Sequence, residues 1–260
     1  MVAAVRVSER DLRTLAGIVS DDRGEPPAAG LAASLLGDLS GLIRCDWLSF
    51  AGQDSRGQAL WFGQAHPVGA GEGADYDDSP FWEHFWGSLP CSYPERTGDL
   101  RGVTKVSDFY SARQWHGTGM YRDCFRPEGV EHEIMVCLPA DPGWWTAGRG
   151  RTVRLVFFRG PGRDFSERDR ALLTLLRPHL QQAYLDAERR RHPEPQLTPR
   201  QWELLRLAAA GHTRAQIARR LGVSEGTVRS HLRNIYARLD VSSRSAAVAR
   251  AFVISQPYRG

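Results

Sequence analysis

The sequence predicts an α+β chain of two domains: an antiparallel sheet with helices, followed by a smaller domain that contains only helices. Strand and helix patterns alternate up to about residue 190, and only helix patterns follow. Between them, RRRHPEPQLTPR (189–200) places three prolines within seven residues, which ends a helix near Arg191. We therefore expect a first domain over 1–191, a linker over 192–197 and a second domain over 198–260.

Net charge changes sign at the same boundary. Residues 196–260 contain 11 arginines and three acidic residues, which gives +8, and the whole chain carries +4, so residues 1–195 carry −4. A basic domain joined to an acidic one predicts that only the C-terminal part meets an acidic partner, either nucleic acid or a membrane surface.

The whole chain also excludes several classes of protein. No run of about 18 apolar residues predicts a membrane span, and the first helical segment is too charged for a signal peptide, so we expect a cytoplasmic protein. The cysteines lack the spacing of a zinc site or a disulfide framework, and we expect ordinary thiols at Cys45, Cys91, Cys124 and Cys137.

In the first domain, Ser8 is suited to cap a helix that runs to about Ser20, and evenly spaced leucines from Leu31 to Leu42 predict a second helix. The segments CDWLSFAG (45–52) and GQALWFGQA (57–65) then predict two strands joined by the turn QDSRG. A Gly/Asp-rich loop over 66–79 leads to Ser79-Pro80, which we expect to begin the short helix FWEHFW.

The rest of this domain begins with residues 90–128, which predict short helical pieces without a regular pattern. Strands are predicted over 130–140 (VEHEIMVCLPA) and 151–159 (RTVRLVFFR). Ser166 is then expected to begin a long helix that reaches about Arg191, with a kink at Pro178.

Capping residues divide the second domain into four helices, over about 199–209, 214–221, 225–239 and 243–254. Thr198 with Gln201, and Thr213 with Gln216, fit the capping-box pattern. Gly222 is placed to end the second of these helices, and Ser224 to cap the third. Only GVS separates the second and third helices, which is a turn of helix-turn-helix length.

The third of these helices carries two different faces. Val228, Leu232, Ile235 and Leu239 form one apolar stripe, while Arg229, Ser230 and Arg233 lie on other sides. The domain is then either a small bundle that only contacts protein partners, or a unit whose third helix enters the major groove of DNA. The basic charge and the arginine and serine side chains, which can bind base edges, favour DNA.

Three segments of this domain, LTPRQ (197–201), IARRLGVSEGTVRSHL (217–232) and RLDVSSRSAAVARA (238–251), resemble the DNA-binding domain of LuxR-type transcription regulators. The resemblance implies that the third helix reads DNA and that the fourth often dimerises. It places Arg229, Ser230 and Arg233 at bases, and Thr213, Gln216, Thr227 and His231 near phosphates. Asp240 stands where glycine is frequent in the family, so the dimer geometry around this turn stays open.

Rival chemistries fit the sequence less well. GVSEG (222–226) matches a nucleophile elbow, but a helix precedes Ser224 where that motif needs a strand. His84, His116 and His132 are scattered, and Asp21-Asp22 follow a helix, which fits neither a metal site nor a phospho-receiver domain. We expect no enzyme activity and no cofactor; a thiol enzyme would require a reactive thiolate among the cysteines.

Seven of the eight tryptophans lie in the first domain. They form either an aromatic core or the lining of a small-molecule pocket, for which the candidates are Trp47, Trp61, Trp82, Trp115 and Tyr121. Residues 107–138 and 162–184 resemble the GAF-like sensor half of LuxR-type regulators. That resemblance implies a GAF/PAS-like fold that senses a small molecule, without implying which one.

The long helix carries more apolar positions than one narrow stripe needs, and we expect part of it to contact a second subunit. The predicted assembly is a homodimer on an inverted repeat of double-stranded DNA, with RNA polymerase a further candidate partner. In an alternative interpretation, the first domain only dimerises and binds no ligand. The candidate dimer contacts are Leu180 and Tyr184 of the long helix, with Val248 and Ala251 of the last helix.

Overall fold

A computed structural model describes residues 7–20, 30–70, 80–138, 151–191, 197–239 and 241–251. The chain divides into two compact units, with the division between Glu188 and Arg189. Residues 192–196, which make up most of the predicted linker, lie outside the described residues. Among the described helices, none is long and apolar enough to cross a membrane.

The N-terminal unit is built on one antiparallel sheet of five strands in the order β2-β1-β5-β4-β3. The strands are β1 (Trp47–Asp54), β2 (Ala59–His66), β3 (Val103–Lys105), β4 (His132–Leu138) and β5 (Arg151–Arg159). The helices are α1 (Glu9–Ser20), α2 (Ala33–Ile43), α3 (Phe81–Phe85), α4 (Leu89–Thr97), η1 (Val106–Asp108), α5 (Ala112–His116), η2 (Tyr121–Phe125) and α6 (Glu167–Arg191). The predicted α+β class, with an antiparallel sheet, is confirmed.

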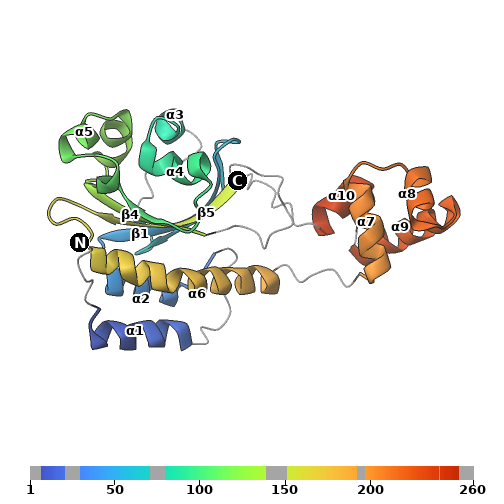
Figure 1. The fold of residues 1–260 in the computed structure, drawn as a ribbon, viewed down its shortest axis with the longest axis horizontal. Helices are drawn as coiled ribbons and strands as arrows, with labels where there is room; N and C mark the ends of the chain where they lie inside the picture. Colours follow the sequence, from blue (N-terminus) through green and yellow to red (C-terminus); the bar gives the residue numbers. More distant parts are fainter. Residues whose placement is uncertain are drawn as a thin grey trace. The chain divides into compact units, whose positions relative to one another are not determined.

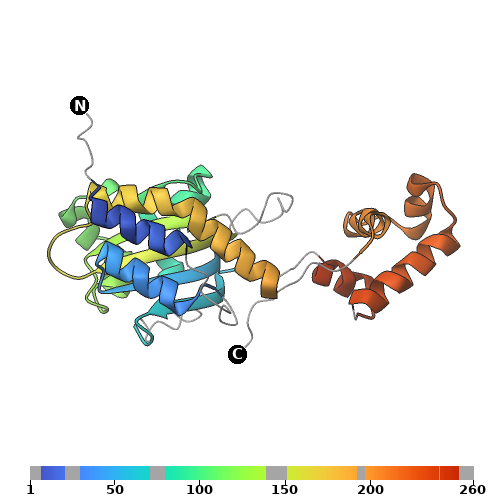
Figure 2. The same ribbon diagram turned by 90° about the horizontal axis from the view of Figure 1, so that it is seen from below.

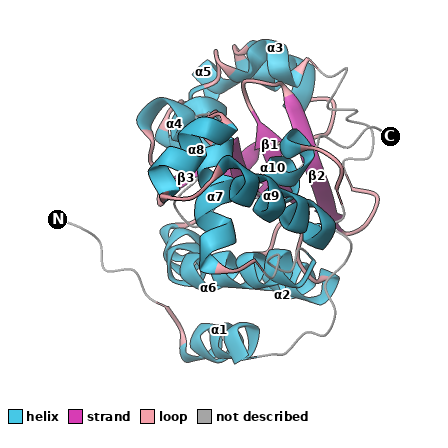
Figure 3. Cartoon of the chain, turned by 90° about the vertical axis from the view of Figure 1, so that its right-hand side faces the viewer, coloured by secondary structure: helices cyan, strands magenta, loops and turns pink. Residues whose placement is uncertain are grey.

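Helices cover both faces of this sheet. Helices α2 and α6 lie against one face with α1 outside them, and α3, α4 and α5 lie over the other (Figure 1, Figure 3). Figure 2, seen from below, shows α2 and α6 along this face with α1 in front of them. Arg168 of α6 binds Asp11 of α1, with its Nε 3.0 Å from Oδ2, and this hydrogen bond holds the pKa of Asp11 well below its usual range.

The alternation of side chains along the strands produces two separate cores. On β4, Ile134, Val136 and Leu138 face α2 and α6, so Glu133, Met135 and Cys137 face the opposite side. We call the cluster beside α1, α2 and α6 the inner core. The second cluster, the aromatic core, contains Trp82, Phe85, Cys91, Val106, Trp115, Met120, Tyr121, Phe125, Val130 and Phe158.

Local sequence signals in this unit are largely confirmed. Ser8 caps α1, because its Oγ accepts the Asp11 N–H at 3.2 Å. Ser166 caps α6 through the Asp169 N–H in the same way, and that helix continues past Pro178 to Arg191. One local prediction is not supported: Pro80, without a side-chain cap, holds the position before α3, and Ser79 lies outside the described residues.

The C-terminal unit contains α7 (Pro199–Ala209), α8 (Arg214–Leu221), α9 (Glu225–Leu239) and α10 (Arg244–Ala251). Both predicted capping boxes are present, and Gly222 ends α8 with a φ of 65°. The last helix begins one residue later than predicted, because Ser243 accepts the Ala246 N–H as its cap. Asp240 and the predicted extension of this helix beyond residue 251 lie outside the described residues.

Candidate nucleic-acid interface and sensor core

Helix α9 separates its two faces as the sequence predicts. Val228, Leu232, Ile235 and Leu239 are at most 7% exposed, and they face α7, α8 and α10. Arg229, Ser230, Arg233 and Asn234 are exposed. The burial therefore fixes which face of α9 packs on its neighbours and which remains open to a partner. Contact between this open face and DNA bases stays a prediction.

The turn between α8 and α9 is held by local hydrogen bonds. Gly222 takes the left-handed conformation, and its N–H donates to the Ala218 carbonyl at the end of α8. Ser224 Oγ accepts the Thr227 N–H at 3.1 Å, which caps α9. Hydrogen bonds thus hold both ends of the short turn from which α9 and its exposed face begin.

The candidate phosphate contacts begin at the start of α8. Thr213 Oγ1 accepts the Gln216 N–H at 3.3 Å, and Gln216 Oε1 accepts the Thr213 N–H at 2.8 Å. Both residues remain exposed despite this pairing. Thr227 is exposed as well, whereas His231 is half-buried. The structure thus leaves the Thr213 hydroxyl proton and the Gln216 amide N–H groups open to an acceptor.

Two arginines of this unit serve the fold rather than an open surface. Arg244 Nη2 donates to the His212 carbonyl at 2.8 Å and to the Ala208 carbonyl, at the end of α7. Arg200 donates to the Leu221 carbonyl at the end of α8. Cations at helix C-termini satisfy the last carbonyls and the helix dipole. The net charge of +8 therefore overstates the cations available to a partner. Within the described residues, the exposed arginines of this unit are 206, 214, 219, 220, 229, 233 and 238.

The five candidate pocket residues of the N-terminal unit do not lie together. Trp82, Trp115 and Tyr121 belong to the aromatic core, and Trp47 packs against it. Trp61 packs against the inner core instead, which corrects the prediction. The cause is a bulge in β2: Phe62 pairs with Gly52 and Leu60 with Gln53, so Trp61 is the extra residue between them.

The aromatic core contains two buried indoles without hydrogen-bond partners. Trp115 lies 5.0 Å from Phe125 and 5.7 Å from Tyr121, measured between ring centroids. Trp82 and Trp115 are 6% and 2% exposed, and within the described residues neither Nε1–H has an acceptor. Such unpartnered buried donors are uncommon in proteins and call for an explanation. Of the other tryptophans, Trp86 is 40% exposed, and 144 and 145 lie outside the described residues.

A buried polar cluster that the sequence analysis missed lies beside these rings. Arg154 of β5 donates to both carboxylate oxygens of Glu95 at 2.6 Å, to the Cys91 carbonyl at 2.6 Å and to Thr152 Oγ1 at 3.1 Å. Glu133 is only 5% exposed, and burial raises its pKa to about 7 although Arg154 opposes the shift. The available signal was one charged residue within an otherwise apolar run of each strand, Glu133 in EHEIMVCL and Arg154 in RTVRLVFFR.

The cysteines have the environment of structural thiols. Burial raises the pKa of Cys91 and Cys137 to about 12 and that of Cys124 to about 11, and it also raises the pKa of Cys45. A catalytic or redox-active cysteine needs a lowered thiol pKa, because the thiolate is the reactive form. These four sites therefore oppose the thiol-enzyme interpretation.

Three histidines of this unit each lie beside a different carboxylate. His84 lies 2.7 Å from Asp123, His116 lies 2.7 Å from Glu131, and His132 lies 3.7 Å from Asp164. Within the described part of the chain, no three His, Cys, Asp or Glu side chains gather in a metal-binding arrangement.

The candidate dimer residues of α6 are buried within their own chain, which corrects the prediction. Leu180 and Tyr184 are 1% and 3% exposed in the inner core, and the Tyr184 ring stacks on Phe62 at 5.9 Å. The wide apolar stripe of α6 is needed to cover the sheet and α2. The apolar side chain that α6 does expose is Leu175, at 55%. In α10, Val248 is half-buried and Ala251 is 5% exposed.

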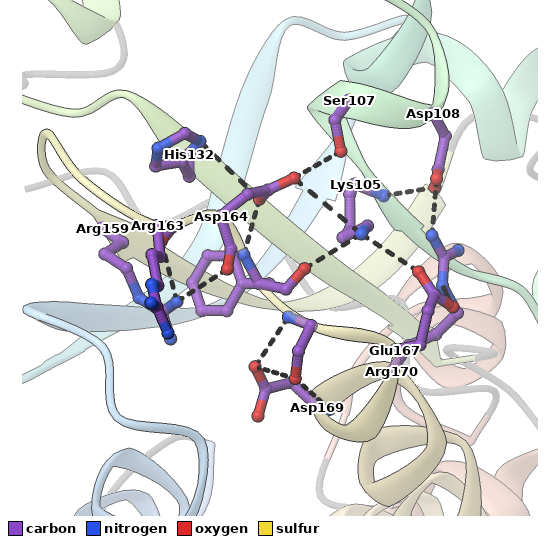
Figure 4. A network of polar contacts seen from close by, with 12 residues as sticks. Lys105, Ser107, Asp108, His132, Arg159, Arg163, Asp164, Glu167, Asp169 and Arg170 are labelled. Atoms are coloured by element: carbon purple, nitrogen blue, oxygen red, sulfur yellow. Dashed lines mark hydrogen bonds and ion pairs between the residues drawn. The ribbon is translucent and has the colours of Figure 1, made fainter. Parts of the chain in front are cut away.

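A polar network fixes the start of α6 to the edge of the sheet (Figure 4). Lys105 of β3 donates to the Phe165 carbonyl at 2.9 Å and binds Glu167 at 3.1 Å. Ser107 donates to Asp164 at 2.5 Å, and Arg170 donates to the Val103 carbonyl at 2.6 Å. The only lysine of the chain thus has a structural position.

Comparison with known proteins identifies the C-terminal unit. Residues 195–251 match the family described as "Bacterial regulatory proteins, luxR family". The probable transcriptional regulatory protein SgaR of Hyphomicrobium methylovorum is 44% identical over 80 residues, which span 30% of this chain and only 38% of SgaR.

Solved structures show the same fold over nearly the whole chain. The crystal structure of Escherichia coli SdiA is 16% identical, with a TM-score of 0.55 over 95% of this chain and 98% of that one. A structure described as "SdiA in complex with octanoyl-rac-glycerol" gives a TM-score of 0.56 at 16% identity, over 95% and 96%. The C-terminal unit therefore contains a domain of the luxR family of bacterial regulatory proteins.

Proposed function

We propose that this protein is a sequence-specific DNA-binding regulator of transcription that acts in the bacterial cytoplasm, with α9 as its recognition helix. The two-faced burial of α9 carries the proposal: its apolar stripe is fully used in packing, while Arg229, Ser230 and Arg233 remain exposed. Arginine can donate two hydrogen bonds to guanine, and serine can donate or accept at a base edge. A capped three-residue turn before α9 gives the helix-turn-helix geometry that suits the major groove.

The start of α8 would hold the DNA backbone in this proposal. Thr213 and Gln216 lie at the N-terminus of that helix, where free backbone N–H groups and the helix dipole favour an anion. Thr227 and His231 would add contacts from α9. Such contacts orient the protein on the duplex without reading its sequence.

The N-terminal domain would bind a small molecule through the aromatic core. The unpartnered N–H groups of Trp82 and Trp115 support this, because an acceptor on a ligand would satisfy them. The fold likeness to SdiA, which one structure shows in complex with octanoyl-rac-glycerol, fits such a role. The candidate lining residues are then Trp47, Trp82, Trp115 and Tyr121, without Trp61.

The same domain would also form a homodimer. Leu12 and Val19 on α1 and Leu175 on α6 are exposed by 45% or more, and burial between two subunits would remove this apolar surface from water. Leu175→Glu should then shift the protein toward monomer in sedimentation at micromolar concentration. Thr174→Glu, at the neighbouring exposed polar position, is the matched control.

Selection of bound sequences from random duplex DNA by the full-length protein tests the main proposal. We expect one inverted repeat to be enriched, because a two-fold dimer reads two related half-sites. Enrichment of a single half-site would contradict the dimer and retain the recognition helix. An unchanged random pool, with DNA bound equally at all sequences, would contradict sequence-specific regulation.

A further inference from the structure

Glu133 is a buried carboxylate without a hydrogen-bonding partner among the residues that the structure describes. It lies on β4 and faces the aromatic core, directly across from Phe158 on β5. Its exposure is 5%, and within the described residues no side chain or backbone N–H donates to its carboxylate. Buried carboxylates are normally paired or hydrogen-bonded, because removing the charge from water is costly.

The neighbouring arginine does not neutralise this carboxylate, because it is already fully engaged. Arg154 forms a two-pronged ion pair with Glu95, whose side chain is 3% exposed, and it also binds the Cys91 carbonyl and Thr152. One guanidinium therefore faces two buried carboxylates in this cluster. The other neighbours of Glu133 include the Cys91 thiol, whose pKa is raised by burial and further by the charge of Glu133, so that it stays protonated and uncharged. An ionised Glu133 thus leaves one negative charge that no side chain of the described residues pairs with.

The side chains above Glu133 are suited to a cation with an apolar body. Phe158 stacks on Trp47 at 3.9 Å between ring centroids and lies 6.1 Å from Phe125. Aromatic faces attract cations through the ring quadrupole, and they also provide apolar contact area. Within the described residues, the indole N–H groups of Trp82 and Trp115 in the same core also lack acceptors, which a polar group of a ligand could supply.

From this arrangement we infer that the aromatic core binds a small amphiphilic amine, whose protonated nitrogen pairs with Glu133 and whose apolar part lies among the rings. The inference rests on the proposed sensor role of the N-terminal domain and specifies its ligand class. An anionic ligand would meet a second negative charge, and a neutral one would leave the carboxylate uncompensated. The amine supplies the positive charge that the buried cluster lacks.

Calorimetric titration of the full-length protein at pH 8 with three probes of matched shape tests the inference. The probes are 2-phenylethylamine, the neutral 2-phenylethanol and the anion phenylacetate. We expect the amine to bind at least about tenfold more tightly than the other two. Glu133→Gln should remove this preference, so that the amine no longer binds more tightly than 2-phenylethanol, and Glu133→Asp should keep it. Glu128→Gln, at an exposed position, is the matched control.

Each other outcome overturns the inference. Tighter binding of 2-phenylethanol would mean that Glu133 pairs with an uncharged donor. Tighter binding of phenylacetate would mean that the ligand binds beside a cation of the protein. Equal amine affinity in Glu133→Gln would mean that the amine binds elsewhere, and lack of saturable binding at millimolar amine would mean that the core is closed to this class. The selection of bound DNA sequences separates this inference from the proposed function. If the protein still selects an inverted repeat but binds no amine, only the ligand class is rejected.

Discussion

Replacement of Glu133 by glutamine should change the pH dependence of stability. Burial raises the pKa of Glu133 from its ordinary value of 4.5 to about 7, and the opposing influence of Arg154 is smaller. Because the folded-state pKa is the higher one, the folded chain binds more protons than the unfolded chain between these values. The free energy of unfolding therefore falls as the pH rises from about 4.5 to about 7, and it stays reduced above that range.

The magnitude follows from the two pKa values. Their difference is about 2.5 units, and at about 1.4 kcal/mol per unit the buried charge costs about 3 kcal/mol above pH 7. Glutamine has nearly the same shape and carries no charge. Glu133→Gln should therefore stabilise the N-terminal domain by up to about 3 kcal/mol at pH 8, and by much less at pH 5.

Urea unfolding followed by tryptophan fluorescence measures this difference, since seven of the eight tryptophans lie in the N-terminal part. Wild type, Glu133→Gln and the exposed control Glu128→Gln would each be unfolded at pH 5 and pH 8. We expect only Glu133→Gln to be more stable than wild type, by a larger free energy of unfolding at pH 8 than at pH 5. If Glu133→Gln differed from wild type by the same amount at both pH values, or by more at pH 5, Glu133 would not be an uncompensated buried charge.

The remaining predictions concern DNA reading, the fold of the C-terminal domain and the thiols. Arg233→Ala should weaken binding to the selected site by roughly 1–3 kcal/mol and relax the preference at one base pair; an unchanged preference would mean a different docking of α9. Thr213→Ala should weaken all sequences alike, through a lost phosphate contact and a cap worth about 1 kcal/mol, and a sequence-dependent loss would contradict its backbone role. Arg244→Ala should lower the melting temperature, because the carbonyls that it binds lose their donor, and an unchanged melting temperature would show that this contact is dispensable. Labelling of the folded protein at pH 8 by a thiol reagent should be slow at all four cysteines because of their raised pKa values, and one fast thiol would revive the thiol-enzyme interpretation.

The C-terminal domain could be predicted closely because its signals are local. Thr198, Thr213 and Ser224 each bond to a backbone group three residues away, so a short segment contains both donor and acceptor. The stripe of α9 follows from helix periodicity alone. The hydrogen bonds of Arg244 to the carbonyls of Ala208 in α7 and of His212 after it could not be read in this way, since these partners lie 36 and 32 residues away in the sequence.

The N-terminal domain shows where pattern reasoning ends. Nothing in the sequence marks the bulge in β2. Pattern reasoning therefore places Trp61 in the same candidate pocket as the other tryptophans. The width of the apolar stripe on α6 does not reveal how many elements of its own chain the helix covers. Pattern reasoning therefore places Leu180 and Tyr184 at a second subunit. The ion pair of Arg154 and Glu95 joins β5 to α4 across 59 residues. Because the sequence does not show that these two residues pair, it does not show that Glu133 lacks a cation of its own.

Binding of the full-length protein to its selected duplex at several salt concentrations tests the central claim most directly. The exposed arginines of the C-terminal domain should neutralise phosphates and release counterions. If one domain contacts about five phosphates, the logarithm of the binding constant should fall with the logarithm of salt concentration with a slope of about −4 to −5 per domain. A slope near zero, with binding unchanged from low to moderate salt, would contradict the assignment of this surface to DNA.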